Sequence, residues 1–302
     1  MSCANFNGLA SQVAQGQAAA AAVVRREGAL AFTLCRRQAA YTYLESTLKL
    51  NPQAPEPQPR SFANWYGQEP AENDRQGNPV AWSSYCAGLE GTGDIYNAGV
   101  VALRDYAEAV QSLADAKAFD GSGLAELGGG VGQLAASFRS PSAISSAASD
   151  IGSAAASLGS PVVTYLRTRE LKKLLTESHA ALARVLASLD RYLAGLEDLR
   201  AFVVLHRGRV VQLLPANRGP GDGFTSAATA AQAYELASDG DVQLDRFAHH
   251  IAANRALVAA IAKTEGALVA AATGGAVLPA RSAAAALSAS IVALNRQPAE
   301  VP

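Results

Sequence analysis

Residues 171–215 read LKKLLTESHAALARVLASLDRYLAGLEDLRAFVVLHRGRVVQLLP, and this stretch decides the fold class. Leucine or valine recurs at every seventh position, and the position three residues further on is also mostly apolar. Two apolar positions in every seven residues form a narrow stripe along one side of an α-helix. The pattern therefore predicts one long helix that buries its stripe against other helices. The first register consists of Leu175, Leu182, Leu189, Leu196, Val203 and Val210.

Two prolines bracket this helix. Pro161 can occupy a first helical turn, and Pro215 ends the apolar repeat because proline cannot continue a helix. A helix over 161–214 would be about 80 Å long at 1.5 Å per residue. A compact domain of this chain length would be much narrower. The sequence therefore predicts an elongated molecule.

The same spacing occurs near both ends of the chain, and residues 94–118 can supply a fourth helix. Isolated helices with narrow apolar stripes are not stable alone, so these segments are expected to pack together. We predict an all-α fold: one elongated antiparallel helical bundle over 1–302, with coiled-coil-like long helices and no strands. The apolar positions are Phe6, Leu9, Val13, Val23, Leu30, Leu34, Tyr41, Leu44 and Leu48 at the N-terminus, and Leu244, Phe247, Ile251, Val258, Ile261 and Leu268 near the C-terminus.

Residues 51–93 interrupt the helical pattern and are predicted to form a long loop. They contain six of the thirteen prolines and both tryptophans. The favoured interpretation is that the aromatic rings plug one end of the bundle, since Trp is usually buried. The alternative is a partner-binding surface, because rigid aromatic rings dominate contact surfaces when they are exposed. The residues concerned are Trp65, Tyr66, Trp82 and Tyr85.

Residues 121–166 are dominated by Gly, Ala and Ser and contain three charges, Glu126, Arg139 and Asp150. Small residues allow helices to approach closely, so short tightly packed helices are the favoured interpretation. A segment that changes conformation is the alternative, because glycine lowers the cost of leaving a helix.

Charge and hydropathy exclude some classes of partner. The chain has 25 Lys and Arg against 26 Asp and Glu, without blocks of like charge. This balance argues against a nucleic-acid surface. No stretch reaches the roughly 18 consecutive apolar residues that a membrane-spanning helix requires.

The sequence offers little catalytic or metal-binding chemistry. Gly130 and Gly132 match a dinucleotide fingerprint, but they follow no predicted strand, so the match lacks its structural context. Asp245, His249 and His250 could contribute to a metal site, although a surface ion pair between Asp245 and His249 is favoured. His206 falls on the long stripe and is expected to be buried and hydrogen-bonded. We predict no enzyme activity, no metal and no cofactor.

Ser2 and Cys3 resemble the processing site of a bacterial lipoprotein. In that family the chain is cut before a cysteine, which receives a lipid on its thiol, and a small residue precedes it. The resemblance implies lipidation of Cys3. Ala4 is not the acidic residue that retains such proteins in the inner membrane, so the resemblance implies the periplasmic face of the outer membrane. A secreted or cytoplasmic protein is the alternative.

With Cys3 assigned to lipid, Cys35 and Cys86 remain as an even pair. In an oxidising compartment they are expected to form a disulfide. Closing a loop of this length would stabilise the fold by about 4 kcal/mol in the chain-entropy model. Two buried free thiols are the alternative.

These features favour a non-enzymatic, lipid-anchored binding or scaffold protein. Its partner would be a protein or a small molecule, and it would meet the membrane only through the lipid. A second hypothesis is a membrane-active protein that uses 121–166 as α-helical pore-forming proteins use their inserting segments. A third is a metal-binding helical bundle.

Overall fold

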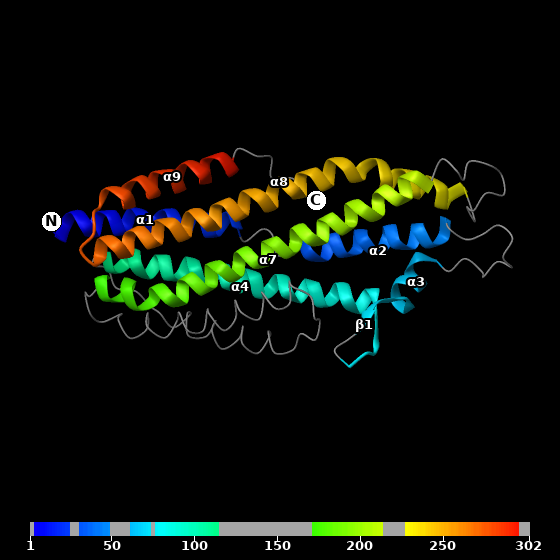
Figure 1. Ribbon diagram of the computed structural model, residues 1–302, viewed down its shortest axis with the longest axis horizontal. Coiled ribbons are helices and arrows are strands. Elements are labelled where there is room, and N and C mark those ends of the chain that lie inside the picture. Colours follow the sequence, from blue (N-terminus) through cyan, green and yellow to red (C-terminus); the bar gives the residue numbers. More distant parts are fainter. Residues whose placement is uncertain are drawn as a thin grey trace.

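The computed structural model describes residues 3–24, 30–48, 61–73, 76–114, 171–213 and 227–295. Within these ranges the chain is mostly helical and contains one small hairpin, which confirms the all-α class (Figure 1). The elements are α1 Cys3–Val24, α2 Leu30–Leu48, α3 Phe62–Gln68, β1 Pro70–Asn73, β2 Pro79–Ala81, α4 Trp82–Ala114, α7 Leu171–Leu213, α8 Ala227–Ala272 and α9 Leu278–Asn295.

The helices lie side by side along the long axis of the molecule. α7 and α8 run in opposite directions over most of its length, and α1 and α2 follow one another against α4 (Figure 1). The 43 residues of α7 correspond to about 65 Å at 1.5 Å per residue. The N-terminus of α1 lies at one end of this rod, and α3 with the hairpin lies at the other (Figure 1).

The predicted stripe of α7 is buried. All six positions from Leu175 to Val210 are fully shielded from solvent, and α7 packs against α8, α2 and α4. The predicted stripe of α8, from Leu244 to Leu268, is buried as well. Apolar periodicity therefore identified the inner face of both long helices.

The N-terminal pattern was expected to form one long segment, but the described residues form two helices with different neighbours. α1 packs against α4, α9 and α8, whereas α2 packs against α7, α4 and α3. The apolar repeat continues through both helices, and Phe6, Leu9, Leu34 and Leu44 are all buried. Periodicity showed which side chains are buried, but it could not show that the neighbours change along the way.

The expectation of a long loop over 51–93 was wrong from residue 62 onward, because α3 and the hairpin lie there and α4 follows them. α4 begins at Trp82, twelve residues before the predicted start, although this stretch contains Ser and Gly residues that are weak helix formers. Burial of Trp82 and Leu89 and the bond at Cys86 fix it as helix. Tertiary packing thus outweighs local propensity here.

The expectation of no strands was also wrong. β1 and β2 pair in antiparallel fashion, with Pro70 opposite Ala81 and Asn73 opposite Pro79. Gly77 in the turn has a φ of +83°, a conformation that favours glycine. The hairpin is too short to show an alternating pattern in the sequence.

α9 is a helix that the sequence analysis did not predict. Pro279 lies in its first turn, where proline is tolerated. The helix packs on α8 and α1, and its buried side chains include Ala280 and Leu287. Its small inward residues leave little periodic hydrophobic signal.

Residues 121–166, Pro161 and the turn expected at 215–224 lie outside the described residues. In the ranges that the structure describes, no helix combines the length and apolar character needed to cross a membrane.

Candidate functional site

One end of the rod is built around six aromatic rings from α2, α3 and α4. Ser61 starts α3, where its hydroxyl accepts a hydrogen bond from the backbone N–H of Asn64 at 3.3 Å. The rings contact one another in a continuous series, and the Trp65 and Trp82 centroids are 6.2 Å apart. The series consists of Tyr43, Phe62, Trp65, Tyr66, Trp82 and Tyr85.

The two tryptophans are the buried centre of this aromatic end. Trp65 is 8% exposed and Trp82 is 6% exposed. Their burial fits the favoured interpretation of a plug, and their rings are not available as an open contact surface. Tyr66 and Tyr85 are half-buried and reach the surface. Burial raises the pKa of Tyr85 to about 12, and Glu72 adds to the increase.

A disulfide joins α2 to α4 beside these rings, as the sequence analysis expected. Cys35 and Cys86 are fully buried and their Cα atoms are 5.5 Å apart. The bond holds the start of α4 against α2. It therefore fixes the place from which Trp82 and Tyr85 project.

A buried carboxylate lies at the same end of the rod. Glu45 of α2 is 6% exposed and faces His206 and Arg209 of α7. Its Oε2 lies 2.9 Å from Nδ1 of His206, and its Oε1 lies 3.5 Å from Nη1 of Arg209. His206 is thus hydrogen-bonded, as expected, although it is only half-buried.

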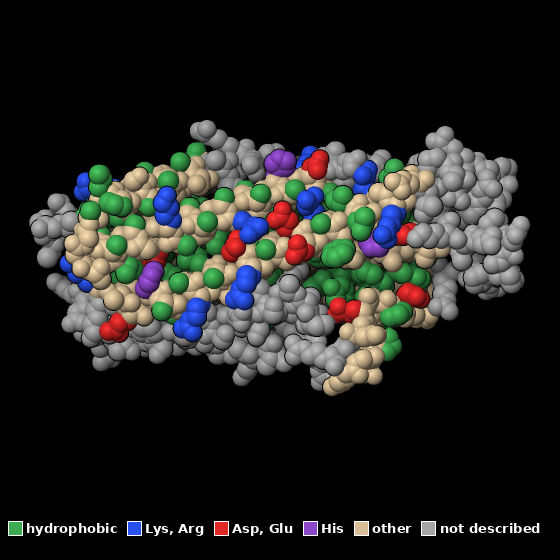
Figure 2. All heavy atoms as spheres, viewed as in Figure 1, with side chains coloured by type: hydrophobic (Ala, Val, Ile, Leu, Met, Phe, Trp, Pro, Cys, Tyr) green, Lys and Arg blue, Asp and Glu red, His purple; other side chains and the backbone are tan. Residues whose placement is uncertain are grey.

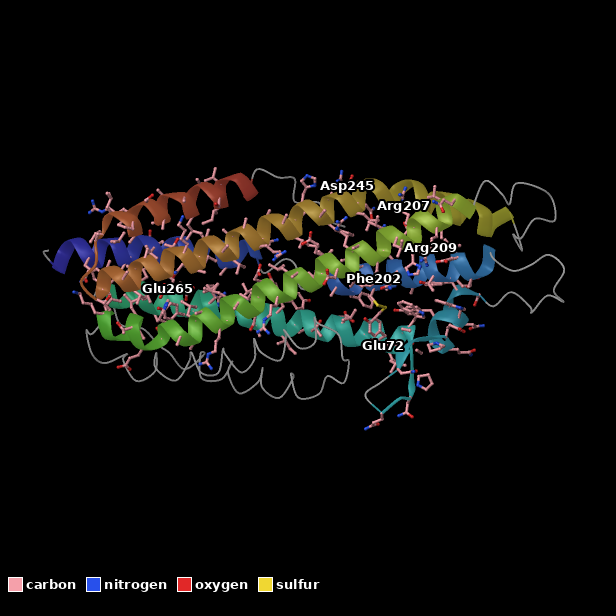
Figure 3. All side chains as sticks on the ribbon, viewed as in Figure 1. Glu72, Phe202, Arg207, Arg209, Asp245 and Glu265 are labelled. Carbon is pink, nitrogen blue, oxygen red and sulfur yellow. A yellow bond between two sulfur atoms is a disulfide. The ribbon has the colours of Figure 1, made fainter. Side chains whose placement is uncertain are left out.

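The outer side of α7 at this end exposes large apolar side chains. Phe202, Val204, Leu205 and Val211 are 54%, 41%, 49% and 40% exposed. Phe202 and Leu205 are three residues apart and therefore share one side of the helix, and we call this pair the α7 apolar strip. Hydrophobic side chains gather along α7 on the side toward β1 (Figure 2). Phe202 lies on that side of the helix (Figure 3). Heptad spacing does not reveal this strip, although five consecutive apolar residues at 201–205 exceed what a buried stripe requires.

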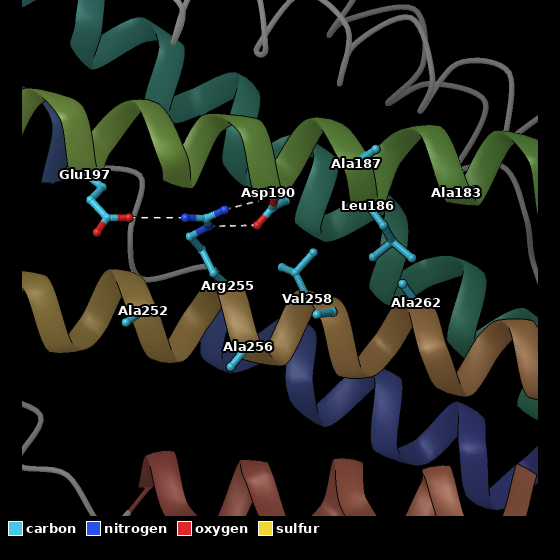
Figure 4. Close-up of a pocket in the computed structure, with 11 residues that line it drawn as sticks. Ala183, Leu186, Ala187, Asp190, Glu197, Ala252, Arg255, Ala256, Val258 and Ala262 are labelled. Atoms are coloured by element: carbon cyan, nitrogen blue, oxygen red, sulfur yellow. Dashed lines mark hydrogen bonds and ion pairs between the residues drawn. The ribbon is translucent and has the colours of Figure 1, made fainter. Parts of the chain in front are cut away.

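A shallow groove of about 750 Å³ separates the middle parts of α7 and α8 (Figure 4). Most of its lining is alanine. Arg255 of α8 bridges it, with Nε 2.9 Å from Asp190 Oδ1 and Nη1 3.2 Å from Glu197 Oε2. The hydrogen bond to Asp190 raises the pKa of Arg255. These pairs are well exposed, so each contributes at most about 1 kcal/mol.

A second buried carboxyl group lies in the other half of the rod. Glu265 of α8 is 2% exposed. Its Oε2 accepts a hydrogen bond from Gln17 Nε2 at 2.8 Å, and its Oε1 accepts one from the Tyr106 hydroxyl at 2.7 Å. The Ser178 hydroxyl lies 3.3 Å from that of Tyr106. Four helices, α1, α4, α7 and α8, therefore meet through polar side chains at this point.

The histidines of α8 form no metal centre in the described residues. His249 Nδ1 bonds to the backbone oxygen of Asp245 at 2.8 Å, so the contact expected between their side chains is replaced by one to the backbone. Both residues are exposed. Among the side chains that the structure describes, no group of three His, Cys, Asp or Glu residues could hold a metal ion.

Cys3 is the first residue of α1. It therefore lies at the end of the rod opposite the aromatic rings and the disulfide (Figure 1).

Comparisons with protein families, with curated proteins and with solved structures gave no match to this chain. The geometry of the described residues is therefore the basis for a functional proposal.

Proposed function

We propose that this chain is a non-enzymatic binding or scaffold protein of the bacterial envelope. In this proposal a coiled-coil-like antiparallel bundle is anchored by a lipid on Cys3 at the periplasmic face of the outer membrane. The end that lies far from Cys3 presents the binding surface. The observation that carries the proposal is the α7 apolar strip.

The α7 apolar strip lies in the part of α7 that contains most of the exposed large hydrophobic side chains. The described residues include six exposed large hydrophobic side chains, and four of them lie within residues 202–211 of α7. The other two, Leu278 and Val292, are separated by most of α9. Single exposed apolar residues are ordinary, but neighbouring ones such as Phe202 and Leu205 indicate an interaction surface. The strip is therefore the best candidate for a partner site.

The charges beside the strip favour a particular kind of partner. Between Asp198 and Leu213, α7 contains Arg200, Arg207 and Arg209 and no acidic residue. A partner with an apolar face bordered by acidic groups would match this surface in hydrophobicity and in charge. A protein helix or a small anionic amphiphile has this chemistry.

The surroundings of the strip supply rigidity. The disulfide joins α2 to α4, and Glu45 of α2 binds His206 and Arg209 of α7. A surface held in this way loses little conformational freedom when a partner binds. The half-buried Tyr66 and Tyr85 can add to the contact area at the same end of the rod.

The position of Cys3 supports the anchoring part of the proposal. A lipid at this residue would hold the end containing the start of α1 at the membrane. The strip would then project from the membrane by up to about 65 Å, the length of a helix of 43 residues. Such a rod can hold a partner at a distance without catalysing a reaction.

The two alternative hypotheses gain no specific support from the described residues. A membrane-active role would depend on residues 121–166, which lie outside the described ranges. A metal-binding role would depend on Asp245, His249 and His250, and the described part of α8 does not combine them with further acids.

Site-specific photocrosslinking in the native cell tests the proposal. A benzophenone amino acid at position 205 should give a discrete adduct, because Leu205 lies in the strip. The same amino acid at position 292 is a matched control, since Val292 is also exposed but lies on α9. Phe202→Ala should reduce the adduct from position 205. Equal adducts from both positions, or none from position 205, would contradict a partner site on the strip.

A further inference from the structure

Glu265 occupies an environment that does not suit a charged carboxylate. Its side chain is 2% exposed, and both hydrogen bonds that it accepts come from neutral groups, Gln17 and Tyr106. Burial disfavours the charged form of an acid unless a cation or several donors compensate. Glu45, by contrast, meets His206 and Arg209 directly.

In the described part of the chain, few ionisable groups lie around Glu265. α1 contains no Asp, Glu, His, Lys, Arg or Tyr. From α4 the facing group is Tyr106, while Arg104 pairs with Asp105 and Glu108 on the same helix. From α7 it is His179, whose charge lowers the pKa of Glu265. Lys263 of α8 and Arg281 of α9 are exposed. Burial has the largest effect and raises the pKa of Glu265 overall, while the hydrogen bonds from Gln17 and Tyr106 lower it.

We propose that Glu265 is a proton-binding site: in the folded protein it is a neutral carboxylic acid that joins four helices. This inference is independent of the partner surface on α7. It rests on the burial of the carboxyl group, its neutral partners and a chain of hydroxyl groups that can rearrange around it.

The hydroxyl groups of Tyr106 and Ser178 can rearrange their hydrogen bonds when Glu265 binds a proton. The Ser178 hydroxyl donates to the backbone oxygen of Leu174 at 2.6 Å, so its own oxygen can accept. When Glu265 is ionised, Tyr106 donates to it. When Glu265 is protonated, its O–H donates to the Tyr106 oxygen, and Tyr106 turns its proton toward Ser178 at 3.3 Å. The three hydroxyl groups then all have acceptors.

Proton binding makes this part of the fold sensitive to pH. An acid whose pKa is raised by folding contributes fully to stability below its unfolded value, here 4.5. That contribution is lost as the pH rises through the folded pKa, because the unfolded chain releases the proton more easily. The junction of α1, α4, α7 and α8 is therefore expected to weaken at higher pH.

Infrared spectroscopy measures the proton directly. At pH 7 the wild-type protein should show a carbonyl stretch of a protonated carboxyl group, which shifts in D₂O. Glu265→Gln should remove this band. Glu45→Gln is the matched control, because Glu45 is paired with the Arg209 guanidinium and should not contribute to the band. A folded wild-type protein without the band at pH 7 would overturn the proposal.

A second variant keeps the test decisive if Glu265→Gln does not fold. Tyr106→Phe removes a donor that favours the ionised carboxylate, so the band should persist to higher pH than in the wild type. A shift to lower pH would contradict the assignment.

Chemical denaturation provides a thermodynamic test. The unfolding equilibrium constant of the wild type, divided by that of Glu265→Gln, should increase by up to about tenfold per pH unit above pH 4.5. A ratio that is independent of pH would also overturn the proposal.

Discussion

Among the residues that the structure describes, two glutamates are buried, one in each half of the rod, and their surroundings differ. Glu45 lies at the aromatic end and faces His206 and Arg209. Glu265 lies in the half that contains α1 and α9 and accepts hydrogen bonds from Gln17 and Tyr106. The same side chain is therefore part of an ionic contact in one half and of a neutral hydrogen-bonded group in the other.

The other interactions follow the same division. At the aromatic end, large rings and a disulfide fix α2, α3 and α4. In the other half, α9 packs on α8 and α1 mainly through alanine. The aromatic end is thus held by a covalent bond and bulky rings, whereas the packing of α9 in the other half depends on the close approach of small side chains. Helices with similar apolar repeats can therefore be stabilised in two ways.

The largest expected effect concerns the buried rings. Trp65→Ala should lower the free energy of unfolding by about 3–5 kcal/mol, because it empties the centre of the aromatic end. Chemical denaturation measures this change. Phe202→Ala is the exposed control and should change stability by no more than about 0.5 kcal/mol. Similar losses for the two variants would mean that the aromatic end is not a packed core.

Removal of the disulfide should have the next largest effect. The variant with Cys35→Ala and Cys86→Ala should lose about 4 kcal/mol, since the unfolded chain is no longer restricted. Amide hydrogen exchange should then rise most in α2, α3 and the start of α4, and least in α9. Equal increases at both ends would show that the two halves unfold together.

The two glutamates should respond differently to the same substitution. Glu45→Gln should lower stability by about 1.5–3 kcal/mol at pH 7, because His206 and Arg209 lose a charged partner. Glu265→Gln should leave stability unchanged or raise it, because the raised pKa means that ionisation of Glu265 opposes folding above pH 4.5. Thermal and chemical denaturation of both variants at pH 7 decide between these outcomes. A loss of equal size at both sites would remove the distinction between the two halves.

Some features of the site could be inferred from particular residues before the structure. The even pair Cys35 and Cys86 indicated a disulfide, and the concentration of Trp65 and Trp82 in one segment indicated an aromatic plug. The α7 apolar strip was missed because heptad spacing marks only the side of a helix that faces its neighbours. Gln17 and Glu265 could not be associated, since 248 residues separate them and neither belongs to a motif.

The helical class and the inner faces of the long helices follow from the sequence, because the apolar repeat that specifies them is local and periodic. Tertiary structure alone decided which helices meet, that α4 begins at Trp82, and that α1 and α2 have different neighbours. It also decided the states of the two glutamates, because the charge of a buried carboxyl group depends on the side chains that other helices bring to it. These contacts join residues far apart in the chain, and no local pattern records them.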